Sequence, residues 1–540
     1  MFVLRKIYIR GAIMKYGVFS QNVWVFPDTD PAEGKKTASL CLLKGQTGGL
    51  QVVIGGLEAG ASINFSVRGA DDLAVFAYRE MEVGVNRNTN GLHCGALTTD
   101  DWDSVSRDRV RKAPYVAYDP LQPLTDLTVE KEQEAYYISI CPTEQADAGE
   151  RTVEITFVFG ESVVSIPITL FVGNKSLPAS TLKLTNWYSI SNMADAHDIE
   201  KNSPEHEAMA KQYFDLLNDC HNNVFWTEIN GYLKAEMRDG EYVFDFTEVK
   251  RWAEFILANT KEGTILEWVP FVGKAAWRSI PFQIHNLVKE KRQDCIYNKG
   301  GRKYLTSFLR QFNDFLTENG WRDISIVHMC DEPTEMNADD FRILAGIFRK
   351  YLPGIKLIDA IEIFFLEESL DIYVPKNSYY QLNKNDFEAL RDDRNELWFY
   401  TCNMPGGKFL NRFLDSPLLN TRLLHWGNYR YDLTGYLHYG FNRTKGGEFV
   451  FEKTSHSASL PAGDANIVYP GQGMPLRSMR FQQMKCGVEE YEILRALSLQ
   501  DKKKADTICK SALWTFDEYI KDVDEFDGIS RELVLAYDNI

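Results

Sequence analysis

Residues 324–333 read ISIVHMCDEP, an apolar run that ends in two adjacent carboxylates and a proline. The isoleucines and the valine are typical of a buried strand, which Pro333 ends because proline has no N–H for a further ladder bond. Adjacent acids repel each other, so partial burial raises the pKa of one and lets the pair hold a proton near neutral pH. Asp331 and Glu332 are therefore candidates for protonating a leaving group, with the capping of a helix at 336–351 as the alternative.

The composition favours a soluble protein of two or three domains. The chain has 540 residues, 44% of them hydrophobic and 25% charged, and no apolar run approaches the length of a membrane span. The net charge of −16 is unfavourable for a nucleic-acid partner, because phosphate backbones need clustered Lys and Arg. Nine cysteines occur singly without a CxxC motif, so we expect no metal, no cofactor, no disulfide framework and a reducing compartment.

The amino-terminal segment, MFVLRKIYIRGAI, is apolar and basic, but Lys6 and Arg10 interrupt any signal-peptide core and no small-residue cleavage site follows. We therefore expect no signal peptide and a cytoplasmic protein. Met14 is an alternative start of translation.

Residues 1–176 are expected to form an antiparallel β-sandwich domain. Short runs rich in β-branched residues are separated by Gly, Asp, Asn and Pro throughout this part of the chain, a spacing typical of sandwiches. A structural or carbohydrate-contacting role without catalysis is the simplest one for this domain. The clearest runs are 50–54, 61–67, 134–140, 152–159 and 163–172.

Residues 177–500 alternate between strand and helix patterns and are expected to form a (β/α)8 TIM-like barrel. Ser203 as N-cap followed by Pro204 is a typical helix start. The remaining residues, 501–540, are expected to be a helical segment packed on the barrel. The expected strands are 181–188, 223–229, 265–272, 324–330, 355–360, 397–402, 435–441 and 465–469, and the expected helices are 203–222, 246–258, 303–319, 338–351, 416–431 and 478–499.

Aromatic and amide side chains recur near the carboxyl ends of these strands, where barrel enzymes carry their active sites. Aromatic faces stack on the apolar faces of sugar rings, and amides exchange hydrogen bonds with hydroxyl groups. Each of these residues is by itself more often a core residue, so the interpretation depends on their repetition at one end. The candidate substrate-binding residues are Trp187, His328, Tyr400, Asn403, Trp426, Tyr439 and Asn442.

The placement of acids favours one kind of glycoside hydrolysis. A glycosidase usually needs two carboxylates on opposite sides of the scissile bond, but the expected seventh strand, 435–444, contains no acid. Acids adjacent in sequence, with Cα atoms about 3.8 Å apart, cannot flank a sugar ring in this way. They can serve a substrate whose 2-acetamido group is the nucleophile. Glu332 would then protonate the glycosidic oxygen and later activate water, while Asp331 would accept the acetamide N–H.

Two alternatives stay open on the residues alone. A glycosidase for a different sugar would combine the pair with another carboxylate, such as Glu228 or Glu267, and a non-catalytic glycan-binding protein would keep only the aromatic platform. Near the end of the region, Asp464 either binds a sugar hydroxyl or pairs with Arg477 or Arg480.

From Lys183 to about Leu497 the chain resembles the catalytic part of glycoside hydrolase family 123 and the related DUF4091 domain. The resemblance implies an N-terminal sandwich and a retaining β-N-acetylgalactosaminidase that uses the substrate-assisted route on a glycan or glycoconjugate. It also implies that Asp331 polarises the acetamide and that Glu332 is the acid/base. Where relatives usually have a strand ending in tryptophan, this sequence has Tyr439, a smaller platform. The motifs that carry the resemblance are LTNWY, VHMCDEP, LWFYTC before Pro405, Arg422 with His425-Trp426, GYLHYGFN, and GDANIVYPG…PLRSMRFQQMKCGVEEYEIL.

Overall fold

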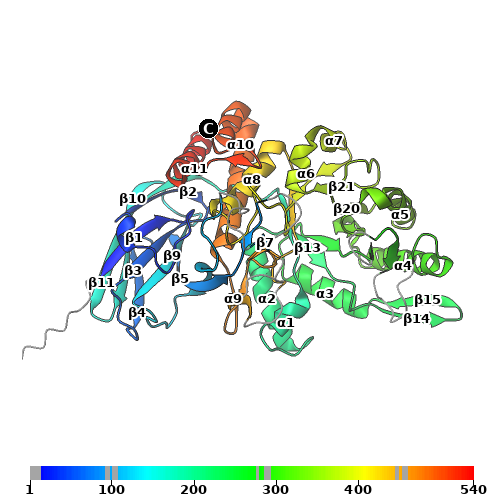
Figure 1. The fold of residues 1–540 in the computed structure, drawn as a ribbon, viewed down its shortest axis with the longest axis horizontal. Coiled ribbons are helices and arrows are strands. Elements are labelled where there is room, and N and C mark those ends of the chain that lie inside the picture. Colours follow the sequence, from blue (N-terminus) through cyan, green and yellow to red (C-terminus); the bar gives the residue numbers. More distant parts are fainter. Residues whose placement is uncertain are drawn as a thin grey trace, which may run out of the picture.

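The protein is a multidomain mixed α/β protein with a β-rich N-terminal region (Figure 1). The amino-terminal segment, in which we expect no signal peptide, lies outside the described residues. No described helix is long and apolar enough to cross a membrane. The computed structural model describes residues 14–91, 98–99, 108–274, 279–284, 294–443, 449–452 and 460–540.

The β-rich region consists of two sheets that enclose their own hydrophobic core. One has the order β1 (Lys15–Ser20), β3 (Gly48–Gly55), β9 (Gln133–Pro142), β5 (Leu73–Val85) and β8 (Tyr115–Pro123). The other has the order β2 (Ala38–Lys44), β11 (Ser162–Ser176), β10 (Gly149–Phe159) and β4 (Ile63–Arg68). The core includes Val52 and Tyr136 from the first sheet, and Ile155 and Ile166 from the second. Along most of β10 and β11 alternate residues are buried, as expected for strands with one face on a core.

The α/β region is built on parallel strands that fall into two sheets. The three-stranded sheet has the order β12 (Lys183–Asn186), β24 (Gly435–His438) and β23 (Phe399–Tyr400). The six-stranded sheet has the order β13 (Val224–Thr227), β16 (Ile265–Trp268), β19 (Ser325–His328), β20 (Lys356–Ile361), β21 (Ile372–Pro375) and β22 (Glu396–Leu397). All neighbours in both sheets run parallel, so their carboxyl ends lie at one edge.

The sequence predicts a single closed barrel, and no closed ladder is detected among the described strands. Between β12 and β13 no ladder forms, and the contact is made by Asn223, whose N–H donates to the carbonyl of Leu184 at 3.2 Å and whose Oδ1 accepts the Leu184 N–H at 3.0 Å. At the other junction β22 and β23 are separated in the chain by one residue, Trp398. The two sheets are therefore joined at both edges by local contacts instead of by a continuous ladder.

One strand was missed and one expected strand was placed wrongly. The strand β21 was missed because Ile372–Pro375 is four residues long and ends in proline. Residues 465–469 were expected to be the last strand, but Tyr469–Pro470 (β25) instead pairs antiparallel with Pro475–Leu476 (β26). Counting along the chain, 435–438 is thus the eighth parallel stretch and not the seventh. The true seventh, 396–400, carries its one acid at its amino end, so its carboxyl end is also free of carboxylates.

The helices agree with the sequence more closely than the strands do. The cap predicted at Ser203 is present, since its hydroxyl accepts the His206 N–H at 3.2 Å and Pro204 follows it. The last predicted helix is longer than expected, with a break at Asp501. The main helices are α2 (Pro204–Asp219), α3 (Thr247–Ala258), α4 (Lys299–Glu318), α5 (Ala338–Tyr351), α8 (Leu419–Tyr431), α10 (Met479–Ala512) and α11 (Val523–Asp538).

Shorter elements complete the chain. The helical ones are η1 (Pro31–Glu33), α1 (Ile190–Asp195), η3 (Arg322–Ile324), η4 (Glu335–Asn337), α6 (Asn377–Leu382), α7 (Lys384–Glu388) and α9 (Phe449–Glu452). The extended ones pair as β6 (Asn88–Thr89) with β7 (Thr98–Thr99), β14 (Lys234–Arg238) with β15 (Glu241–Asp245), β17 (Val272–Lys274) with β18 (Phe282–Ile284), and β27 (Leu513–Thr515) with β28 (Glu518–Tyr519).

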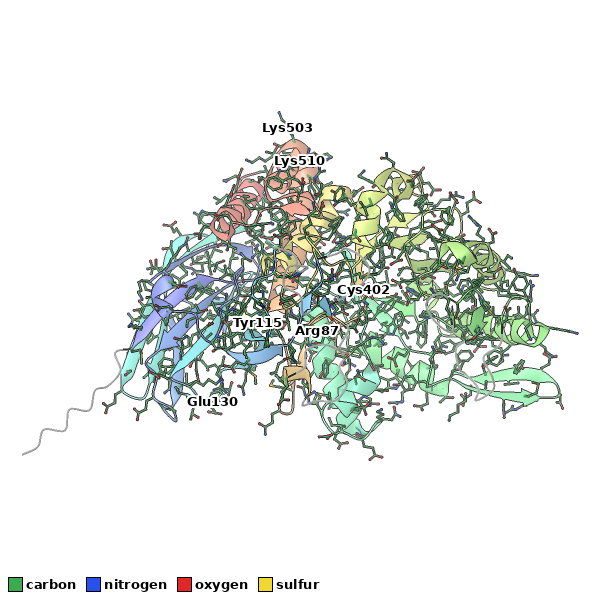
Figure 2. The ribbon with its side chains drawn as sticks, viewed as in Figure 1. Arg87, Tyr115, Glu130, Cys402, Lys503 and Lys510 are labelled. Carbon is green, nitrogen blue, oxygen red and sulfur yellow. The ribbon has the colours of Figure 1, made fainter. Side chains whose placement is uncertain are left out.

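Buried polar contacts join the two regions. The guanidinium of Arg480 on α10 lies 2.8 Å from a carboxylate oxygen of Asp119 on β8, and both side chains are shielded from water. The hydroxyl of Tyr469 donates to the same carboxylate at 2.7 Å. Tyr115, which lies at the boundary between the two regions (Figure 2), donates to the carbonyl of Leu414 at 3.3 Å. These contacts fix the α/β region against the five-stranded sheet.

The C-terminal helix contacts the β-rich region as well as the other helices. α11 packs on β2 and β11 and also against α10 (Figure 1). Asp538 near its end accepts the backbone N–H of Lys175 at 2.9 Å, and Asp527 accepts the side-chain amide of Asn22 at 2.6 Å. The last helix therefore covers part of the N-terminal sheets.

Replacing Asp119 with Asn tests the junction between the regions, because it leaves the guanidinium of Arg480 buried without its charged partner. We expect the free energy of unfolding to fall by about 3–5 kcal/mol, the usual cost of an uncompensated buried charge. Urea unfolding followed by tryptophan fluorescence measures this. The matched control is Asp524→Asn, which removes an exposed pair with Lys35 and should cost less than about 1 kcal/mol. An unchanged midpoint for Asp119→Asn would contradict the role of the pair.

Candidate active site

The chain turns sharply after β19, and this turn presents the two adjacent acids. Asp331 has a φ of 73° and Glu332 a φ of 49°, in the left-handed region that side chains other than glycine rarely adopt. The turn is held by β20, because the N–H groups of Cys330 and Asp331 each donate to the carboxylate of Asp359 at 2.9 Å. The N–H of Glu332 donates to the carbonyl of Ala360 at 3.1 Å. Such strained backbone at a strand end is typical of functional sites.

The pair does not cap the following helix. A capping box is formed instead by Thr334 and Asn337, in which the Thr334 N–H donates to the Asn337 side chain at 2.8 Å. The alternative of a capping role for Asp331 and Glu332 is therefore wrong.

A buried histidine lies behind the pair. Nδ1 of His328 is 3.1 Å from a carboxylate oxygen of Glu267, and Nε2 is 3.2 Å from Asp359 and 3.9 Å from Asp331. Burial by itself disfavours the charged ring, yet Asp359 and Glu267 outweigh burial and raise the pKa of His328 to about 10. The ring is thus an imidazolium with both nitrogens facing carboxylates. Predicted as a substrate-binding residue, His328 is placed by the structure beneath the site and not on its open face.

Asp331 is poised to carry a proton near neutral pH. Half of its side-chain surface is exposed, but the surrounding protein partly buries the carboxyl group. This burial and the charge of Glu332 raise the pKa of Asp331 to about 7, against the opposing effects of His328 and Lys274. Asp331 is therefore partly protonated at neutral pH.

Glu332 is held from the opposite side. The hydroxyl of Tyr400, which ends β23, donates to Oε1 of Glu332. The Nζ of Lys376 lies 4.0 Å from the same oxygen and forms an ion pair with Glu362. Lys274 donates to the backbone carbonyl of Glu332. The oxygen Oε1 of Glu332 is thereby fixed in position.

Two tryptophans pack against the buried histidine. Trp187 after β12 and Trp226 on β13 stack with ring centroids 3.9 Å apart, and both meet the ring of His328 nearly edge-on. The indole N–H of Trp187 donates to Glu267 at 3.2 Å. Glu267 also accepts the hydroxyl of Thr185 at 2.7 Å and is fully buried, so this acid cannot reach a substrate.

Glu228 is the other acid that the sequence left open. It follows β13, and burial raises its pKa to about 7 in spite of the nearby charge of Arg443. Arg443 lies over the ring of Trp226 at 6.0 Å and donates to the carbonyl of Tyr188 at 3.4 Å. Burial lowers the pKa of Arg443, and the charges of Glu228, Tyr439 and Asp331 oppose this effect.

Several predicted substrate-binding residues are engaged elsewhere. Trp426 is fully buried on α8, and its indole N–H donates to Glu490 on α10 at 2.8 Å, so the structure does not bring it to the pair. The amide of Asn442 exchanges two hydrogen bonds with the backbone of Ser189, at 2.8 Å and 3.1 Å, and joins two strand-end loops. Asn403 is half-buried three residues after Tyr400.

Tyr439 donates its hydroxyl to Asp464, whose pKa burial raises to about 7. The predicted pairing of Asp464 with an arginine is not what the structure has. Arg480 pairs with Asp119 at 2.8 Å, and Arg477 pairs with Asp219 at 3.1 Å. The buried carboxyl group of Asp464 therefore orients the phenol of Tyr439, which follows β24.

Three side chains at the site come close enough together to be considered for a cation. His328, Asp331 and Asp359 offer one nitrogen and two oxygens within 4.8 Å of one another. The fit is poor, because an imidazolium has no lone pair to give and both oxygens of Asp359 accept backbone N–H groups. We assign the three as an ion-pair cluster.

Three important residues of the site were missed by sequence reasoning. Lys376 and Glu362 follow β21 and β20, and neither stood out while β21 itself was unrecognised. Asp359 had a signal, since an acid inside the apolar run KLIDAI must be bonded if that run is a buried strand.

Comparison with known proteins gives one family. Residues 187–497 match the glycoside hydrolase 123 catalytic domain. The fold is similar to that of a family 123 glycoside hydrolase from Clostridium perfringens analysed for glycolipid glycan hydrolysis, with 13% identity, a TM-score of 0.69 and 97% of each chain covered. A GH10 xylanase with a bacterial Ig-like domain from termite gut gives 9% identity and a TM-score of 0.35 over 85% of this chain and 100% of that one.

A β-galactosidase from the psychrophilic Marinomonas ef1 gives 9% identity and a TM-score of 0.36 over 61% of this chain and 62% of that one. No curated protein matches. The family match extends over more than half of the chain and contains both acids of the strand-end turn. The protein therefore belongs to glycoside hydrolase family 123 and is a glycoside hydrolase.

Proposed function

We propose that the protein cleaves β-linked N-acetylgalactosamine with retention of configuration, by substrate-assisted catalysis through an oxazolinium intermediate. Glu332 is the general acid/base, Asp331 polarises the 2-acetamido group, and no cofactor takes part. The observation that carries this proposal is the adjacent pair in its strained turn, with Asp331 holding a proton near neutral pH while Glu332 is fixed by Tyr400.

The geometry leaves the role of the nucleophile to the substrate. Both carboxylates leave one strand end, so neither can attack from across the sugar ring while the other protonates the glycosidic oxygen. Glu267 is sealed beneath Trp187. An acetamide carbonyl, supplied by the sugar itself, fills the missing role.

Binding of the sugar would move the shared proton. An acetamide N–H that donates to Asp331 stabilises the carboxylate form of Asp331. The proton of the pair is then held by Glu332 instead. Glu332 then gives this proton to the glycosidic oxygen as the C–O bond breaks, and the acetamide oxygen bonds to the anomeric carbon. In the second step Glu332 takes a proton from water, which attacks the same carbon and opens the ring of the intermediate.

The remaining features of the proposal concern architecture and recognition. We take the two parallel sheets to act as one (β/α)8-type barrel over 177–500, flanked by a sandwich domain at 1–176 and a helical segment at 501–540. Tyr400, Tyr439 and Asn403 remain candidates for contacting the glycan. A cytoplasmic location is also part of the proposal, and the unpaired cysteines of the described residues fit a reducing compartment.

Replacing the acids one at a time tests the roles. Glu332→Gln should lower kcat at least about 100-fold, because general acid catalysis is lost, and Asp331→Asn should lower it comparably with an acetamido substrate. The measurement is hydrolysis of paired chromogenic β-glycosides, N-acetylgalactosaminide against galactoside, with a thiazoline as a mimic of the intermediate. Cleavage restricted to the acetamido sugar and blocked by the thiazoline is the expected result.

The matched variant is Glu228→Gln, which removes the other acid of raised pKa from the same site. It should keep hydrolysis of the acetamido sugar within about tenfold of the wild type, since substrate assistance needs no third carboxylate. Equal cleavage of both sugars, together with loss of activity in Glu228→Gln, would show a protein nucleophile and refute substrate assistance.

The pH dependence follows from the shared proton. The active form carries one proton on the pair, and the pKa of Asp331 is about 7, so kcat/KM should fall as pH rises above 7. The decline should approach about tenfold per pH unit, because the pair loses its proton in that range. Initial rates from pH 5 to pH 9 measure it, and a flat profile up to pH 9 would contradict the assignment of the proton.

A further inference from the structure

A lysine is buried directly behind the carboxylate of Glu332. Lys376 follows β21, and its side chain is 1% exposed. Its Nζ lies 4.0 Å from Oε1 of Glu332 and forms a closer ion pair with Glu362. The same ammonium group lies over the ring of Tyr400, whose hydroxyl donates to that Oε1. The ammonium group of Lys376 and the phenol of Tyr400 therefore both contact the same oxygen of Glu332.

The ammonium group stays charged in spite of its burial. Burial lowers the pKa of a lysine, but Cys402, Glu332 and Glu362 outweigh burial and hold the pKa of Lys376 above its usual value. Cys402 lies near the middle of the α/β region (Figure 2). Because Glu362 makes the close ion pair, it is the counter-ion that keeps this charge in the interior.

We propose that Lys376 is a positioning residue whose charge, moderated by Glu362, sets how tightly Glu332 holds its catalytic proton. This inference rests on the proposed role of Glu332 as acid/base. When Glu332 gives its proton to the glycosidic oxygen, the carboxylate that remains faces Lys376 and Tyr400. A cation at that distance stabilises the carboxylate, whereas the negative charge of Glu362 beyond it weakens the effect.

The other groups around the pair are already balanced. His328 and Lys274 favour the carboxylate form of Asp331, and Asp359 opposes it. Lys376 forms an ion pair with the carboxylate of Glu332 at 4.0 Å, so the pair Lys376–Glu362 places a variable charge on the acid/base itself. The titratable and charged groups around Asp331 and Glu332 are His328, Asp359, Lys274, Tyr400, Cys402 and Arg443, besides Lys376 and Glu362.

The test uses two substitutions that remove charges of opposite sign. The quantity measured is the pH at which kcat/KM falls on the alkaline side of its pH profile, called the alkaline limb. Lys376→Met removes the positive charge, so the proton is held more tightly and the limb should move up by about one pH unit. Glu362→Gln removes the negative charge and leaves Lys376 to act on Glu332 alone, so the limb should move down by a similar amount. A purely structural role would lower the rate without displacing the limb in opposite directions.

The matched control is another Lys–Glu pair of the same sheet. Lys356 begins β20 and lies 2.7 Å from Glu396 at the amino end of the strands. Lys356→Met changes the net charge as Lys376→Met does, but it is remote from the carboxyl ends, so the limb should stay within about 0.2 pH units of the wild type. Circular dichroism and thermal unfolding of each variant show whether it is folded.

Opposite displacements in the two variants support the inference. Limbs that stay at the wild-type pH, or that move in the same direction, overturn it. If Lys376→Met does not fold, the direction in Glu362→Gln decides alone. Failure of the proposed function is distinguishable, because Glu332→Gln would then retain activity. If only this inference fails, Glu332→Gln is inactive and the alkaline limbs of Lys376→Met and Glu362→Gln stay at the wild-type pH.

Discussion

A buried imidazolium holds together the carboxyl ends of three parallel strands. His328 at the end of β19 lies between Glu267 on β16 and Asp359 on β20, and all three side chains are shielded from water. None of these charges is stable alone in the interior, so each strand end fixes its neighbour. Asp359 also accepts the N–H groups of Cys330 and Asp331, which hold the strained turn. The geometry of the adjacent acids Asp331 and Glu332 follows from this one cluster.

The two acids of the pair lie between cations of different kinds. Behind Asp331 is the imidazolium, locked by its two carboxylates, and behind Glu332 is the ammonium of Lys376, with a single close counter-ion in Glu362. The first cation serves mainly to build the turn. The second cation contacts the carboxylate that we propose as the acid/base, and Glu362 is its close counter-ion.

The pair and the helices could be predicted from the sequence because their signals are local. Two acids at the end of an apolar run, or a Ser-Pro start, need no partner to be recognised. Long-range pairings were not predictable, since nothing near His328 indicates which distant acids surround it. Aromatic composition alone also cannot tell which face of a helix is covered, and Trp426 was misplaced for that reason. The strand β21 was not predicted because it is only four residues long, and Lys376, which follows it, was missed for the same reason.

The position of α11 has a consequence for the order in which the protein is made. Asp538 of α11 accepts the backbone N–H of Lys175 on β11, so segments far apart in the sequence meet where α11 packs on β2 and β11. A ribosome completes the β-rich region first, but the helix that covers it is synthesised only after the α/β region. The N-terminal domain must therefore wait, partly uncovered, through the synthesis of more than half the polypeptide. Chaperones that bind nascent chains would meet that surface during this interval.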